Sequence, residues 1–179
     1  MRLELVDRRT DLPVPDPWAG AREQWPRLEA LAQLTGPADW KVDLVLVDDE
    51  AMAGLNTRWR GDDGTTDVLS FSYLEREGSG TADLAAGDAE SACDLWLAAE
   101  GAGDAGVVGE LVLAPAFVEG RCREQGWNPE HEWALLVVHG CLHLLGWEHG
   151  DDESRRAMQE REASILARHD LPHPLRERS

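Results

Sequence analysis

The chain has 179 residues, of which 42% are hydrophobic, and its 35 acidic and 17 basic residues give a formal net charge of −18. This length suits one domain with its own core, and no apolar run approaches the ~18–20 residues that cross a bilayer, which excludes a transmembrane helix. This acidity argues against binding to a nucleic-acid backbone, unless a local basic cluster provides the contacts. The alternative interpretation is that the acidic surface is a property of the whole proteome and not of this protein's function.

The N-terminal segment and the cysteines indicate the cellular compartment. Residues 1–18 alternate charged and apolar side chains and lack the apolar stretch of a secretory signal. The three cysteines, Cys93, Cys122 and Cys141, form no CxxC motif, and their odd number does not suit a disulfide framework. We therefore expect a reduced, cytoplasmic protein.

Predicted strands and helices alternate in the first half of the chain. A proline-rich link over 12–17 suits neither a helix interior nor a strand ladder, and Gly36 ends the helical pattern that follows it. Asp48 or Asp49 is the expected N-cap of the next helix. The predicted elements are a strand over 2–6, a helix over 18–34, a strand over 42–47, a helix that ends near residue 60 and a strand over 68–71.

Residues 77–106 differ in composition from the rest of the chain. They contain nine Ala, six Gly and seven acidic residues and no basic residue, too little apolar surface to offset the entropy of ordering them. We predict a flexible acidic insertion between two strands, with a functional arm as the alternative.

The second half of the chain is predominantly helical. The predicted elements are a strand over 107–113, a helix over 115–125, a helix from 129 to about 144 and a helix from 153 to about 168. Gly126 ends the first of these helices, Asn128 caps the second, and Asp151 or Asp152 caps the third. The order of elements predicts a single α+β domain over residues 1–179, with a four-stranded mixed sheet and about five helices packed on it.

Three histidines near the end of the central predicted helix have the spacing of metal ligands. His139 and His143 are one helical turn apart on the same face, and Gly146 lets the chain leave the helix with a positive φ, which brings His149 back toward them. Three neutral imidazoles leave one open position on a tetrahedral ion, as in catalytic zinc sites. The alternative is two packed helix histidines with His149 at the surface.

Gly140 and Cys141, which lie between the first two histidines, limit the reactions and the ligand sets that this site suits. Zinc proteases of the HExxHxxGxxH type carry a glutamate as general base directly after the first histidine, where this chain has Gly140. Glu148 or Glu110 would have to replace that base. Cys141 points to the far side of the helix, so we expect it to pack and not to bind metal.

The segment HGCLHLLGWEH over 139–149 resembles the HGxLHLxGYDH signature of the YbeY family, bacterial endoribonucleases and ribosomal RNA maturation factors. LNTRWR over 55–60 and TDVLSF over 66–71 are similar to the family's LNxxYR and TDVLSF blocks, and GEL over 109–111 stands where the family has a GDI-like strand. The resemblance covers about residues 40–168. Trp147 replaces the usual Tyr and Glu148 the usual Asp, and neither change removes a ligand.

The resemblance implies one zinc ion per chain, held by His139, His143 and His149. It also implies that Arg60 is essential for RNA cleavage, and a planar guanidinium can indeed hold two phosphate oxygens and stabilise charge on the scissile group. A cation at this helix end would equally suit the helix dipole, which is the structural alternative. Arg58 is a second candidate for RNA binding, on a different face of the helix.

The function implied by the resemblance is metal-dependent cleavage of single-stranded RNA in the maturation of the 16S ribosomal RNA 3′ end and in ribosome quality control. The implied partners are ribosomal RNA and small-subunit ribosomal proteins, and neither DNA nor a membrane. A zinc-dependent peptide or amide hydrolase is an alternative that Gly140 disfavours. A non-catalytic ribosome-assembly factor with a structural zinc is another, favoured by the acidic charge because ribosomal proteins are strongly basic.

Overall fold

The computed structural model describes residues 1–10, 12–74 and 107–177 of the chain. The predicted insertion over 77–106 lies outside the described residues. None of the described helices is long and apolar enough to cross a membrane.

The described strands form one mixed sheet in the order β1-β2-β4-β3. Its strands are β1 (Arg2–Asp7), β2 (Lys41–Leu46), β3 (Val68–Ser72) and β4 (Val107–Leu113). The pairs β1–β2 and β2–β4 are parallel, whereas β3 runs antiparallel to β4 at the edge of the sheet. The central strands β2 and β4 are almost continuously buried, as expected for strands covered on both faces. The predicted fold class, an α+β domain with a four-stranded mixed sheet, is confirmed.

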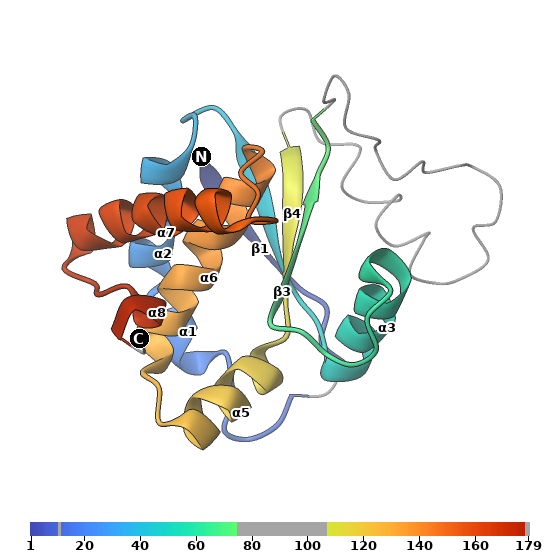
Figure 1. The fold of residues 1–179 in the computed structure, drawn as a ribbon. Coiled ribbons are helices and arrows are strands. Elements are labelled where there is room, and N and C mark those ends of the chain that lie inside the picture. The colour runs from blue at the N-terminus through green and yellow to red at the C-terminus, as the bar shows by residue number, and fades with distance from the viewer. Residues whose placement is uncertain (11, 75–106, 178–179) are drawn as a thin grey trace, which may run out of the picture.

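Helices cover both faces of this sheet (Figure 1). The helices are α1 (Ala19–Glu23), α2 (Trp25–Thr35), α3 (Asp49–Arg60), α5 (Pro115–Gln125), α6 (Pro129–Leu144), α7 (Asp152–Leu166) and α8 (Pro174–Glu177), with a 3₁₀ turn η1 (Ala167–His169) after α7. Figure 1 shows α1, α2, α6 and α7 on one side of the sheet and α3 on the other. The larger core lies between the sheet and α2 and α6, and a smaller one lies on the α3 side.

The predicted helix over 18–34 is wrong in one respect, because the structure divides it into α1 and α2 at Gln24. Pro26 stands in the first turn of α2, where its missing N–H costs nothing. In a continuous helix, the same ring would clash with the carbonyl four residues earlier. The break lets Trp18, at the start of α1, pack edge-to-face on Trp133 of α6 at 4.9 Å between ring centroids.

The end of α5 and the starts of α6 and α7 follow the predicted signals closely. Gly126 ends α5 with φ 68°, the Asn128 side chain accepts a hydrogen bond from the Glu130 N–H at the start of α6, and Asp151 forms a capping box with Ser154 in α7. The last predicted helix is shorter than expected, because α7 ends at Leu166 and continues only as η1. Helix α8 was not predicted from the sequence.

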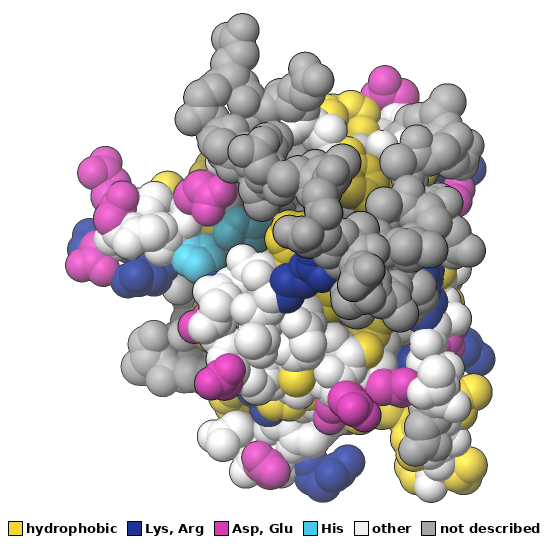
Figure 2. Space-filling model, turned by 90° about the vertical axis from the view of Figure 1, so that its right-hand side faces the viewer, with side chains coloured by type: hydrophobic (Ala, Val, Ile, Leu, Met, Phe, Trp, Pro, Cys, Tyr) yellow, Lys and Arg dark blue, Asp and Glu magenta, His cyan; other side chains and the backbone are white. Residues whose placement is uncertain are grey.

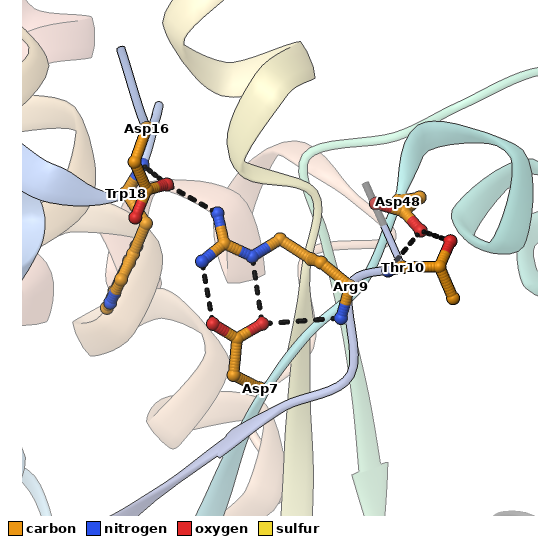
Figure 3. A network of polar contacts seen from close by, with 6 residues as sticks. All are labelled: Asp7, Arg9, Thr10, Asp16, Trp18 and Asp48. Atoms are coloured by element: carbon orange, nitrogen blue, oxygen red, sulfur yellow. Dashed lines mark hydrogen bonds and ion pairs between the residues drawn. The ribbon is translucent and has the colours of Figure 1, made fainter. Parts of the chain in front are cut away.

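A buried arginine after β1 joins the N-terminal strand to the segments around it (Figure 3). The Arg9 guanidinium donates two hydrogen bonds to Asp7, at 2.9 and 2.7 Å, and one to Asp16 at 2.6 Å. Only 3% of the Arg9 side chain is exposed. Asp48 has the predicted N-cap position of α3, but its carboxylate accepts hydrogen bonds from the backbone and hydroxyl of Thr10 and makes no cap bond.

Two glycines let α6 and β3 pack closely against β4. A Cβ atom on Gly140 of α6 would lie 2.7 Å from Leu111 Cδ2 of β4, and one on Gly109 of β4 would lie 2.4 Å from the Phe71 carbonyl oxygen of β3. Both distances are shorter than carbon contacts allow. The C-terminal end of α6 is therefore held directly over β3 and β4, which positions the histidines of that helix.

Candidate metal centre and cleft

The three histidines with ligand spacing lie together at the C-terminal end of α6. Their ligand nitrogens all lie within 4.8 Å of one another, and the Nε2 atoms of His139 and His143 are 3.1 Å apart. Bonds of about 2.0–2.1 Å around a tetrahedral zinc ion place the ligand nitrogens roughly 3.3 Å apart. The donor set and its spacing therefore fit a transition-metal ion of this size.

The end of α6 explains how His149 reaches the other two histidines. The Trp147 N–H donates to the Leu142 carbonyl at 3.0 Å and the Gly146 N–H to the His143 carbonyl at 2.9 Å, the two bonds of a Schellman motif. Gly146 has φ 93°, a conformation that glycine adopts without steric cost. This turn reverses the chain as the sequence predicts, and the His149 ring stacks on the His139 ring with 5.4 Å between centroids.

The electrostatic environment keeps the central histidine neutral. Burial lowers the pKa of His143 to about 4, and the neighbouring His139 and His149 contribute to the same shift. At neutral pH the imidazole therefore has a lone pair available for a metal ion. Cys141 is fully buried, and burial raises the pKa of its thiol to about 12, as expected for a packed residue that binds no metal.

A cleft of about 420 Å³ opens beside the histidines along the edge of the sheet. The described lining residues come from the end of α3, from β3 and from the end of α6 and the turn after it: Trp59, Arg60, Val68, Leu69, Ser70, Phe71, Ser72, His139, His143, Glu148 and His149. Figure 2 shows histidine side chains at the surface of this side of the molecule, between acidic side chains and a basic patch.

The outer edge of β3 provides backbone groups beside the cleft. The Asp67 carbonyl accepts a hydrogen bond from the N–H of Ala114, directly after β4, and the Tyr73 N–H donates to the Val108 carbonyl of β4. Because bonding directions alternate along an antiparallel ladder, the N–H and C=O groups of Val68, Ser70 and Ser72 point away from β4. The cleft therefore combines backbone donors and acceptors, three imidazoles and one guanidinium among its described lining residues.

The two candidate arginines occupy different positions. Arg60 is the last residue of α3 and contributes to the cleft lining, next to a C-cap Gly61 with φ 74°. Arg58 is exposed, lies over the Trp59 ring at 5.5 Å and is not a lining residue. Of the two acids that could replace the missing protease base, Glu148 lines the cleft and Glu110 lies buried within β4.

Sequence reasoning missed two buried residues behind the histidines. His139 Nδ1 lies 2.8 Å from Glu162 Oε1, and Glu162 Oε2 lies 2.8 Å from His173 Nε2. Burial acts to raise the pKa of Glu162, but the hydrogen bonds from His139 and His173 outweigh it and lower that pKa overall. One sequence signal was available, because Glu162 lies between Met158 and Ile165 on the apolar stripe of α7.

Comparisons with known proteins show what this chain is similar to. A family profile described as "Endoribonuclease YbeY" matches residues 22–170. The chain is similar to an endoribonuclease YbeY of Pseudomonas putida, at 36% identity over 96% of this chain and 91% of the relative, and to one of Magnetococcus marinus, at 35% identity over 84% and 92%. A Thermotoga maritima protein of known solution structure matches with 20% identity and a TM-score of 0.45, over 92% of this chain and 91% of that chain.

Proposed function

Because this chain belongs to the endoribonuclease YbeY family, we propose that it is a metal-dependent endoribonuclease that cleaves single-stranded RNA during ribosomal RNA maturation. The observation that carries this proposal is the cleft in which three histidines converge and Arg60 contributes to the same lining. We infer that His139, His143 and His149 hold one zinc ion per chain. Zinc suits three imidazoles with one open position, although nickel suits the same ligands.

Different residues of the cleft have different roles in the proposed phosphodiester cleavage. A bound zinc ion would supply a Lewis acid that polarises a phosphoryl oxygen and lowers the pKa of water toward ~7. Arg60 grips phosphate oxygens through its planar guanidinium and stabilises the charge that develops on the scissile group. Among the described lining residues, Glu148 contributes the carboxylate, and we assign it to accept a proton from the attacking water.

Binding of RNA by a chain with a net charge of −18 requires a local source of positive charge. Arg60 supplies it within the cleft lining, and Arg58 at the same helix end provides a second cation for a phosphate outside it. The outward-facing backbone groups of Ser70 and Ser72 in β3 can hydrogen-bond to bases or ribose without regard to charge. We propose single-stranded ribosomal RNA as the substrate, with the 3′ region of 16S ribosomal RNA as the segment that the family resemblance implies.

The acidic surface supports a second candidate function, a ribosome-assembly factor whose metal is structural. Such a surface would attract small-subunit ribosomal proteins, which are strongly basic. A peptide or amide hydrolase is disfavoured, because Gly140 occupies the position of the protease base and its close packing on Leu111 leaves no room for a larger side chain.

Cleavage of a labelled single-stranded RNA, with and without a chelator, tests these functions against one another. We expect cleavage that the chelator abolishes and added zinc restores, and no cleavage of DNA or of a peptide. The His143→Ala variant should lose most of its metal, about one ion per chain in the unsubstituted protein, and all of its cleavage. Cleavage that persists without metal would contradict the proposed mechanism, and metal-loaded protein without any cleavage would favour the assembly factor.

A further inference from the structure

A hydrogen-bonded chain of three buried or half-buried side chains lies behind the candidate metal centre. It runs from His139 Nδ1 through the two carboxylate oxygens of Glu162 to His173 Nε2, with both contacts at 2.8 Å. Only 2% of the Glu162 side chain and 1% of the His173 side chain are exposed. These two residues lie in α7 and in the segment between η1 and α8, far in sequence from the histidine motif.

The geometry determines which nitrogen of His139 faces the cleft. A carboxylate only accepts hydrogen bonds, so the Nδ1 atom of His139 must carry the proton that it shares with Glu162. In a neutral imidazole with this tautomer, the lone pair lies on Nε2, and the Nε2 atom of His139 faces His143 Nε2, 3.1 Å away. Glu162 thus holds His139 in the tautomer and orientation that a metal ligand requires.

His173 fixes the carboxylate in turn. With His173 on Oε2, the Oε1 atom cannot rotate away from His139 without loss of a buried hydrogen bond. His173 is held in place because Leu171 and Pro174 on either side of it are also buried. The packing of this C-terminal segment therefore fixes the position of the Glu162 carboxylate, and the carboxylate in turn fixes the orientation of His139.

The charge of Glu162 adds to this effect. A buried carboxylate is costly without a cation, and the hydrogen bonds of two imidazoles offset only part of that cost. A divalent ion on His139 would lie one imidazole ring away from this negative charge. Glu162 therefore strengthens metal binding through Coulomb attraction as well as through orientation.

We propose that Glu162 and His173 are positioning residues that set the metal affinity of the three-histidine centre through His139. The proposal rests on the metal site of the proposed function and extends it to residues that touch neither metal nor RNA.

Zinc affinity of the full-length chain, measured by competition with a chromophoric chelator, tests the proposal. Glu162→Gln keeps the shape of the side chain and removes its charge, and it should raise the dissociation constant roughly 10–100-fold. His173→Ala should raise it in the same direction, and His173→Gln, which keeps an N–H donor, should recover part of the loss. Glu160→Gln, an exposed position on the same helix, is the matched control and should leave the constant unchanged.

A second measurement needs no variant. Long-range ¹H–¹⁵N spectra of the zinc-loaded chain should show His139 bound to metal through Nε2 and protonated at Nδ1. Thermal unfolding of each variant without zinc separates a general loss of stability from a specific loss of affinity.

Each outcome has a distinct meaning. Zinc binding by the unsubstituted chain with equal affinity in Glu162→Gln, or a His139 bound through Nδ1, overturns this inference and leaves the proposed function standing. A chain that binds no zinc at all overturns the metal site and the inference with it. A loss of affinity in both Glu162→Gln and His173→Ala, with partial recovery in His173→Gln, supports the proposal.

Discussion

At the scale of single residues, Arg60 has the clearest separation between a structural and a functional role. As a basic residue in the last turn of α3, it interacts favourably with the helix dipole, and it also lines the cleft to which the three histidines contribute. The structural role contributes about 0.3–1 kcal/mol and any cation fulfils it. The proposed role in RNA cleavage needs a guanidinium in this place.

We expect Arg60→Glu to abolish RNA cleavage and leave folding and metal content unchanged. An exposed charge reversal at a helix end commonly costs only ~0.5–1 kcal/mol of unfolding free energy, whereas a carboxylate in the cleft repels the phosphate. Cleavage rate, zinc content and chemical denaturation check the three parts. The matched control is Arg123→Glu, the corresponding charge reversal in the last turn of α5. Cleavage at the unsubstituted rate in Arg60→Glu would make the assembly factor the better hypothesis.

At the scale of elements, the cleft depends on how closely β3 approaches β4. Gly109 lies directly opposite Ser72 in the antiparallel register, and its missing Cβ leaves room for the Phe71 carbonyl and a methyl group of Leu144. The close contact between Gly109 of β4 and Phe71 of β3 therefore sets the position of β3, whose opposite edge lines the cleft.

Gly109→Ala should destabilise the protein by about 1–3 kcal/mol, because the added methyl group meets backbone that cannot move independently. Urea denaturation measures this change. The control is Gly54→Ala in the exposed interior of α3, where a Cβ atom meets nothing within 4 Å. That substitution should be neutral or stabilise by up to ~1 kcal/mol, since alanine is the better helix former. Equal stability of the two variants would contradict the close approach of the strands.

The Arg9 network makes a separate contribution, with a defined pH dependence. Hydrogen bonds from the Arg9 guanidinium lower the pKa of Asp7 and of Asp16 below the ordinary value of 3.8. Groups with a lowered pKa in the folded state stabilise it above their ordinary pKa, and this stabilisation is lost as the pH falls through the lowered value.

Arg9→Met should therefore cost roughly 1.5–3 kcal/mol of unfolding free energy at pH 7, the range for hydrogen bonds to charged groups. The difference from the unsubstituted chain should narrow as the pH falls below about 4, when the two carboxylates become protonated in both proteins. Urea denaturation at a series of pH values measures it. Arg155→Ala, which removes an exposed ion pair to Asp152, is the control and should change stability by less than ~1 kcal/mol at any pH. A difference independent of pH would contradict the assigned pairing.

At the scale of the whole molecule, net charge and local charge oppose each other. A chain with a charge of −18 repels RNA at long range, and the cations at the end of α3 attract it only at short range. We therefore expect this protein to bind RNA through few phosphate contacts.

The affinity for single-stranded RNA should therefore depend weakly on salt. Each phosphate contact contributes about −0.7 to the slope of log K against log salt for single strands, so one or two contacts give a slope between about −0.7 and −1.4. Fluorescence anisotropy over a range of salt concentrations measures this slope. Arg60→Glu should make it shallower by about 0.7, the contribution of one phosphate contact. A slope several times steeper would show a basic surface beyond the residues considered in this proposal.

The features that could be predicted from the sequence depend on residues close together in the chain. Helix caps at Asn128 and Asp151, the end of α5 at Gly126 and the return of His149 through Gly146 follow from local backbone chemistry. The three histidines meet because one helical turn and one Schellman motif suffice to bring them together.

The features that join distant segments could not be predicted, because they depend on how the helices and strands pack. The order β1-β2-β4-β3 places the edge of β3 beside α6, which no local pattern encodes. The pairing of Glu162 with His139 and His173 depends on how α7 and the C-terminal segment pack on α6. A buried polar residue shows in sequence only as an exception to an apolar stripe. Its partner is set by packing between helices, because a hydrogen bond across the core has no fixed separation along the chain.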